Sequence, residues 1–105
     1  MGDTLQKLYE TIKSRKGADA SSSYTASLFE KGTAKIAQKV GEEAVETCIE
    51  ALQNNPEKLT QESADLLYHL LVLWADQGIT PDDVFAVLEK RNGTSGHDEK
   101  AARGK

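Results

Sequence analysis

Residues 33–77 contain two stretches of helical periodicity that meet at the NNP sequence of residues 54–56. Because the residue before a proline disfavours the helical conformation, this sequence ends the first helix, and Pro56 is well suited to begin the second. A connection this short makes the two helices antiparallel neighbours. We therefore expect a helix hairpin at the centre of the fold.

Three further segments have the spacing or the end signals of helices. The first has apolar residues at the i, i+3, i+4 and i+7 positions of an amphipathic helix: Leu5, Leu8, Tyr9 and Ile12. A short helix is expected to end before Gly32, with Thr33 as the N-cap of the helix that follows. Thr80 and Pro81 predict the start of a last helix, in which Val84, Phe85 and Leu88 are expected to face inward. The expected helices cover residues 4–16, 24–31, 33–54, 56–77 and 81–91.

The chain has 105 residues, which is enough for one domain. No segment alternates apolar and polar residues in the manner of a strand, so the predicted fold is an all-α bundle of four to five helices. The apolar arc of residues 33–54 is wider than one covering layer requires, which suggests a helix buried on two sides, in a bundle or dimer core. We expect a domain over residues 1–91, completed by dimerisation, and a flexible basic tail over residues 92–105.

The composition excludes several functional classes. The net charge of −4 argues against binding to nucleic acid or to an anionic membrane through bulk charge. No run without a charge is longer than that of residues 66–75, which is too short to cross a bilayer. The first residues do not have the pattern of a signal peptide. The single cysteine, Cys48, is expected to be a small core residue, which fits a reducing cytoplasm.

The segment of residues 62–75 is apolar almost all round, and its only side chains that are charged or titrate near neutral pH are Glu62, Asp65 and His69. These three share one face of the expected helix. A helix this apolar is expected to be buried, so its two carboxylates would need partners in the interior. His69 has two interpretations, a hydrogen-bonded core histidine or a ligand or base.

Glu43 and Glu46 have the same i, i+3 spacing as Glu62 and Asp65, and the hairpin lets the two pairs converge. Two like charges about 4 Å apart at an effective dielectric constant of about 20 repel by about 4 kcal/mol, so either a divalent cation or lysine side chains must compensate them. Oxygen ligands without cysteine suit Mg²⁺, or alternatively Mn²⁺. Taken alone, the glutamates of residues 42–50 would instead indicate a solvated helix face. Lys35 and Lys39 are equally compatible with ion pairs along the helix and with contacts to phosphate.

The sequence resembles a known family. The spacing Glu43-x-x-Glu46, fifteen residues, Glu62-x-x-Asp65 matches the E-x-x-E…E-x-x-D pattern of the all-α, MazG-like nucleotide pyrophosphohydrolases. More specific strings resemble the phosphoribosyl-ATP pyrophosphatases of histidine biosynthesis. They are SSYTASL at 22–28, KGTAKIAQKVGEEAVE at 31–46, ESADLLYHLLVLWADQGI at 62–79 and SGHDEKAAR at 95–103.

The resemblance implies a cytoplasmic, magnesium-dependent homodimer or higher oligomer that hydrolyses phosphoribosyl-ATP to phosphoribosyl-AMP and pyrophosphate. It implies metal ligation by Glu43, Glu46, Glu62 and Asp65, and it places Glu42 beside the attacking water. On this hypothesis Lys35 and Lys39 would stabilise phosphoryl oxygens, and the basic tail would close over the nucleotide. Three residues at the end of a flexible loop would contact the nucleotide: Ser23, Tyr24 and Thr25.

Two other functions compete with this interpretation. A housekeeping hydrolase of ordinary or damaged nucleoside triphosphates would share the acidic pattern and differ only in the pocket for base and sugar. A helical interaction module would use the acidic face to bind a basic partner, with Glu62 and Asp65 solvated or paired with lysines. Only the enzymatic functions predict that Mg²⁺ stabilises the fold.

Overall fold

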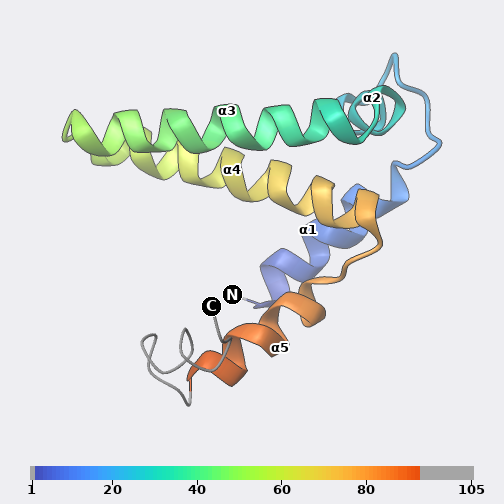
Figure 1. The fold of residues 1–105 in the computed structure, drawn as a ribbon. Coiled ribbons are helices and arrows are strands. Elements are labelled where there is room, and N and C mark those ends of the chain that lie inside the picture. The colour runs from blue at the N-terminus through green and yellow to red at the C-terminus, as the bar shows by residue number, and fades with distance from the viewer. Residues whose placement is uncertain (1, 93–105) are drawn as a thin grey trace.

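The computed structural model describes residues 2–92, and over that range the chain forms five helices and no strands (Figure 1). The helices are α1 (Gly2–Ser14), α2 (Tyr24–Lys31), α3 (Thr33–Leu52), α4 (Pro56–Gln77) and α5 (Pro81–Asn92). The all-α prediction is confirmed, and the bounds predicted for α2 and α4 are correct. Residues 93–105 of the predicted tail lie outside the described residues.

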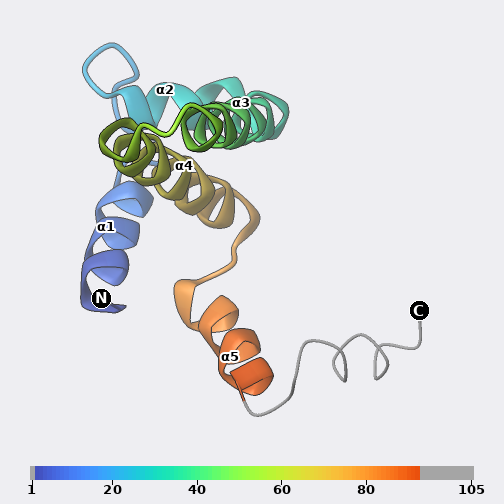
Figure 2. The same cartoon turned by 90° about the vertical axis from the view of Figure 1, so that its left-hand side faces the viewer.

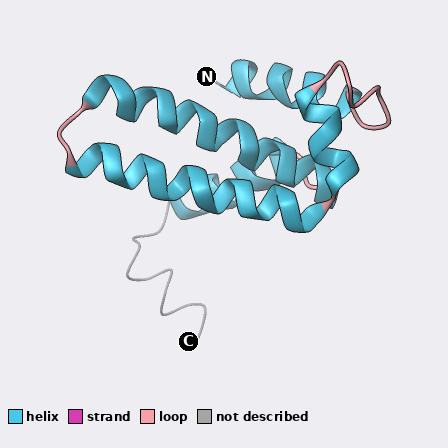
Figure 3. Cartoon of the chain, turned by 90° about the horizontal axis from the view of Figure 1, so that it is seen from above, coloured by secondary structure: helices cyan, strands magenta, loops and turns pink. Residues whose placement is uncertain are grey.

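The antiparallel hairpin of α3 and α4 is the largest packed unit of the chain, and the two helices lie side by side along their length (Figures 1 and 3). Asn55 caps α4, since its side chain accepts a hydrogen bond of 3.2 Å from the backbone N–H of Lys58. Pro56 occupies the first turn, where its missing N–H costs nothing. At the other end Gly78 adopts the left-handed conformation, with φ of 74°, and ends the helix.

Three local predictions differ from the structure. α1 ends at Ser14, because the N–H groups of Arg15 and Lys16 turn back to carbonyls three residues earlier. α3 ends at Leu52, two residues before the predicted end, and Asn54 takes a positive φ of 57° in the turn. Thr33 is the first residue of α3 and not its N-cap, a position that Gly32 occupies. The Thr33 hydroxyl instead donates a hydrogen bond of 2.6 Å to Asp76 on α4.

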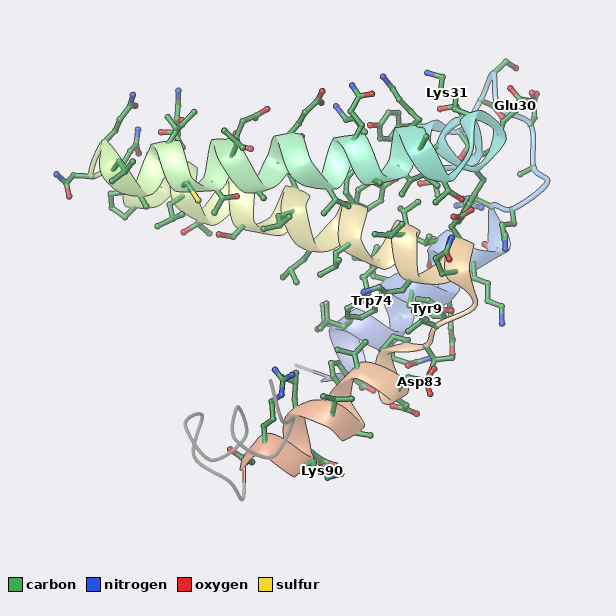
Figure 4. All side chains as sticks on the ribbon, in the orientation of Figure 1. Tyr9, Glu30, Lys31, Trp74, Asp83 and Lys90 are labelled. Carbon is green, nitrogen blue, oxygen red and sulfur yellow. The ribbon has the colours of Figure 1, made fainter. Side chains whose placement is uncertain are left out.

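The core lies where α1 and α2 pack against one end of the hairpin. Its buried members come from four helices: Tyr9, Ile12, Leu28, Ile36, Leu71, Val72 and Ala75. Trp74 is partly buried against this cluster, and Figure 4 shows it with Tyr9 where α1 passes α4. The Tyr9 hydroxyl donates a hydrogen bond of 2.8 Å to the carbonyl of Ile79, which ties α1 to the segment that leads into α5.

Helix α5 leads away from the hairpin on the same side as α1, with which it makes its main contacts (Figure 2). Val84 and Phe85 are half-buried, as their predicted inward positions require. Leu88 is 53 % exposed, so the prediction that it faces inward is wrong. Within residues 2–92 no layer covers this face of α5.

The broad apolar face of α3 is also left open. Val45, Ile49 and Leu52 are 58 %, 42 % and 82 % exposed, and Leu67 on α4 is 43 % exposed. Cys48 lies on the same helix and is exposed, so the prediction of a core cysteine is wrong. The helical periodicity identified an apolar arc correctly, but packing among the described residues covers only part of it. In residues 2–92 no helix combines the length and the apolar character needed to cross a membrane.

A leucine substitution tests the assignment of the core. Leu71 is 1 % exposed, so Leu71→Ala should lower the free energy of unfolding by about 2–5 kcal/mol through lost burial and the cavity that remains. The matched control, Leu88→Ala, removes the same atoms from a half-exposed position and should cost less than about 1.5 kcal/mol. Urea denaturation measures both values, and equal losses would contradict the proposed core.

Candidate active site

Three carboxylates from α3 and α4 converge on the hairpin. One oxygen each of Glu43, Glu62 and Asp65 lies within 4.8 Å of the other two. Glu43 is 8 % exposed, Glu62 is half-buried and Asp65 is exposed. The antiparallel packing of the two helices therefore produces the predicted meeting of acidic residues, at a cluster that is buried on its α3 side. We call these three residues the carboxylate cluster.

Two oxygen atoms of the carboxylate cluster have no hydrogen-bond partner. They are Oε1 of Glu43 and Oε1 of Glu62, and both are inaccessible to solvent. A buried carboxylate oxygen without a donor is costly, and native proteins avoid it unless an ion or a water completes the site. Carboxylate oxygens are the ligands that Mg²⁺ and Mn²⁺ prefer, so the residues present fit a hard divalent cation.

The charges of the carboxylate cluster change the pKa of Glu62. Partial burial, followed by the proximity of Glu43 and then of Glu46, raises the pKa of Glu62 from its usual 4.5 to about 6. Each of these causes disfavours the ionised form. The site therefore holds negative charge against both desolvation and repulsion, which is the condition that a bound cation would relieve.

Glu46 was predicted as the fourth ligand, and the structure places it at the rim of the carboxylate cluster. Its side chain is exposed, and it is not among the three residues whose oxygens converge. It nevertheless lies close enough to Glu62 to raise the pKa of that residue. The i, i+3 spacing thus predicted the correct side of α3, whereas only Glu43 of that pair reaches the point of convergence.

Glu42 lies outside the carboxylate cluster, one residue and about 100° around α3 from Glu43. Its carboxylate accepts a hydrogen bond of 2.9 Å from Gln38 and pairs with the Lys39 ammonium at 3.3 Å. The bond from Gln38, and then the one from Lys39, lowers the pKa of Glu42, while Lys35 adds a weaker favourable charge. In this structure Lys39 therefore forms the ion pair along the helix that the sequence allowed.

The three residues predicted to contact substrate lie together at the start of α2. Ser23 is the N-cap and accepts a hydrogen bond of 3.1 Å from the N–H of Ala26. The Tyr24 hydroxyl lies 3.1 Å from Nε2 of His69, and the Thr25 hydroxyl bonds to that of Tyr68. The start of α2 is thereby fixed to α4 one turn from Asp65.

The sequence analysis missed the part that Tyr68 plays and left that of His69 open. His69 is 6 % exposed and its Nδ1 lies 2.8 Å from the backbone carbonyl of Asp65, so it is a hydrogen-bonded core histidine. The available signal was its position four residues after Asp65 on the same face of α4. Nothing in the sequence pointed to the Tyr24 hydroxyl as its second partner.

Comparison with known protein sequences identifies the family of the chain. Residues 5–92, which include nearly all of the five helices, match the sequence model of the family described as phosphoribosyl-ATP pyrophosphohydrolase. The chain belongs to this family. The family resemblance inferred from the sequence is confirmed, and membership makes the chain a hydrolase of a phosphoric anhydride bond.

Individual members of the family are similar over almost the whole chain. A phosphoribosyl-ATP pyrophosphatase of Azospirillum brasilense is 62 % identical over 99 residues, which cover 94 % of this chain and 89 % of that protein. One from Paramagnetospirillum magneticum is 59 % identical over 96 % of this chain and 93 % of its own length. One from Rhizorhabdus wittichii is 55 % identical over 100 % and 99 % of the two chains.

The raised pKa of Glu62 predicts a pH-dependent stability of the metal-free protein. Because the folded-state pKa is about 6 and the unfolded value is 4.5, the contribution of Glu62 is fully present below about pH 4.5 and is lost as the pH rises through 6. Glu62→Gln cannot ionise. In EDTA, the melting temperature of Glu62→Gln minus that of the wild type should therefore be larger at pH 7.5 than at pH 4.5.

Thermal denaturation at the two pH values measures this difference in melting temperature. Glu89→Gln on α5 removes one negative charge outside the carboxylate cluster and provides the control. A difference between Glu62→Gln and wild type that does not change with pH would contradict the electrostatic description of the cluster.

Proposed function

We propose that this chain hydrolyses phosphoribosyl-ATP to phosphoribosyl-AMP and pyrophosphate, an early step of histidine biosynthesis, with Mg²⁺ as cofactor and Mn²⁺ as a possible substitute. The observation that carries the proposal is the carboxylate cluster, with its two solvent-inaccessible oxygens, in a member of this family. The cytoplasm is the setting in which such a biosynthetic enzyme would meet its substrate.

Glu43, Glu62 and Asp65 would hold the cation, with Glu46 as a further ligand from the rim. When bound, Mg²⁺ neutralises charge on a polyphosphate and lowers the pKa of a bound water. The same cation would reconcile a chain of net charge −4 with a polyanionic substrate. Glu46 lies one helical turn from Glu43 on the same side of α3, which is the position that a further ligand would need.

The remaining polar residues would bind and orient the substrate. Lys39 has a long, flexible side chain, and a phosphoryl oxygen would compete with Glu42 for its ammonium group. Once Lys39 leaves, the main positive charge that lowers the pKa of Glu42 is gone, and the carboxylate becomes a better proton acceptor. On this proposal Glu42, or a carboxylate of the cluster, takes the proton of the attacking water. Lys35 would assist Lys39.

Three residues at the start of α2 would contact the nucleotide: Ser23, Tyr24 and Thr25. Tyr24 is 53 % exposed, so its ring is available for stacking, and it is held beside the helix that carries Asp65. A housekeeping nucleoside triphosphate hydrolase would use the same cluster. The identity to proteins named phosphoribosyl-ATP pyrophosphatase favours phosphoribosyl-ATP as the substrate.

The release of pyrophosphate from phosphoribosyl-ATP and from a panel of nucleoside triphosphates, with Mg²⁺ and with EDTA, tests the proposal. We expect turnover of phosphoribosyl-ATP alone, abolished by EDTA. Glu43→Gln and Glu62→Gln should lower kcat/KM by about 100-fold or more, the effect of removing one electrostatic contact from a transition state. Glu89→Gln is the control and should retain activity.

Each other outcome has a defined meaning. Near-wild-type rates in Glu43→Gln or Glu62→Gln would reject the proposed ligands. Turnover of the nucleoside triphosphates instead would assign the chain to the housekeeping function. No turnover, together with no effect of Mg²⁺ on the melting temperature, would favour the interaction module.

We further propose that the enzyme is a homodimer or a higher homo-oligomer. The exposed apolar side chains of α3, among them Val45 and Ile49, form a face that a second copy would bury. Ile49→Glu should therefore shift the protein toward monomers in sedimentation or light-scattering measurements, because it would bury a charge at the interface. Thr11→Glu adds the same charge to an exposed position of α1 and should leave the assembly unchanged. A wild-type monomer would refute this proposal.

A further inference from the structure

The start of α2 is attached to α4 through two adjacent residues. The Tyr24 hydroxyl meets Nε2 of His69 at 3.1 Å, and the hydroxyls of Thr25 and Tyr68 bond to each other. The aromatic rings of these residues also pack against one another. Tyr24 stacks on Tyr68 with ring centroids 6.3 Å apart, and His69 meets Tyr68 edge-on with centroids 4.9 Å apart. The attachment is thus specified by shape and by hydrogen bonding.

The backbone carbonyl of Asp65 decides which atoms of His69 and Tyr24 donate hydrogen bonds in these contacts. The backbone carbonyl of Asp65 can only accept, so Nδ1 of His69, which lies 2.8 Å from it, must carry a hydrogen. In a neutral imidazole Nε2 is then an acceptor, and the Tyr24 hydroxyl donates to it.

His69 has the properties of a rigid support. It is 6 % exposed, and both of its ring nitrogens have a partner, the Tyr24 hydroxyl at Nε2 and the Asp65 carbonyl at Nδ1. Tyr24, in contrast, is 53 % exposed, although its hydroxyl and its ring contact His69 and Tyr68. The carbonyl that orients His69 belongs to Asp65, whose side chain is part of the carboxylate cluster. A buried histidine therefore links an exposed tyrosine to the frame of the metal-binding helix.

We infer that His69 and Tyr68 are positioning residues, which hold Tyr24 and Thr25 in fixed register with the carboxylate cluster so that the nucleotide is bound at the correct distance from the reacting phosphate. This inference rests on the proposed function. It assigns His69 no contact with the cation or the substrate. Loss of the contact should weaken substrate binding and leave the chemical step largely intact.

Two variants of His69 separate its two contacts. The longer side chain of His69→Gln places an amide oxygen near the position of Nε2, so this variant preserves an acceptor for Tyr24. The shorter side chain of His69→Asn places an amide N–H near the position of Nδ1, so this variant preserves only the donor to Asp65. We expect His69→Asn and Tyr24→Phe to raise KM for phosphoribosyl-ATP about tenfold, which is the factor that corresponds to one hydrogen bond. His69→Gln should stay within about threefold of the wild type.

The same series distinguishes positioning from a general structural role. In His69→Asn and Tyr24→Phe, kcat and the affinity for Mn²⁺ without substrate should remain within about threefold of the wild-type values. The double variant should be no worse than either single variant, because both remove one interaction. Equal increases in KM for His69→Gln and His69→Asn, or none for Tyr24→Phe, would overturn the inference.

The proton on His69 can be tested without any activity measurement. The chain has two histidines, so His97→Gln leaves one imidazole in a nitrogen-15 NMR spectrum. Above about pH 8, where a histidine is neutral, we expect the Nδ1–H tautomer, and loss of the Tyr24 bond in Tyr24→Phe should shift the Nε2 resonance. The Nε2–H tautomer would overturn the inference. A wild-type chain without turnover that shows the expected tautomer would reject the proposed function alone.

Discussion

The packing of α3 against α4 forces like charges together, and the proposed chemistry of the chain depends on that constraint. Ile36 on α3 and Leu71 and Val72 on α4 are at most 1 % exposed, and each buried aliphatic side chain of this kind contributes about 1.5–3 kcal/mol. This burial fixes the register of the hairpin. The register in turn holds Glu43 and Glu62 together, although burial and repulsion both oppose it. The core thus provides the stability that an acidic site requires.

Helix α4 acts as the common frame for two sets of residues. It carries Glu62 and Asp65 on one turn, and on the next it carries Tyr68 and His69, which hold the start of α2. The proposed metal ligands and the proposed nucleotide contacts are therefore related through one rigid element and not through a loop.

Much of this arrangement follows from the sequence, because end signals and periodicity are local properties. Pro56, Gly78 and Gly32 marked helix ends correctly, and the i, i+3 spacing identified the acidic faces. Periodicity cannot show which neighbour covers an apolar arc, so the sequence placed Cys48 and Leu88 in the core while one copy leaves both exposed. It also cannot show which side chain of a pair reaches the point of convergence, or that Tyr24 and His69, 45 residues apart, would meet.

The metal-dependent enzyme and the interaction module differ in the size of the partner that the carboxylate cluster would bind. A basic protein partner would neutralise exposed carboxylates such as Glu46 and Asp65, because lysine and arginine side chains approach from solvent. It would not reach Oε1 of Glu43 or of Glu62, since both atoms are inaccessible even to water in this structure. An ion bound between the helices would contact all three residues of the carboxylate cluster at once. The burial of these oxygens thus favours the proposed metal site over an acidic docking surface.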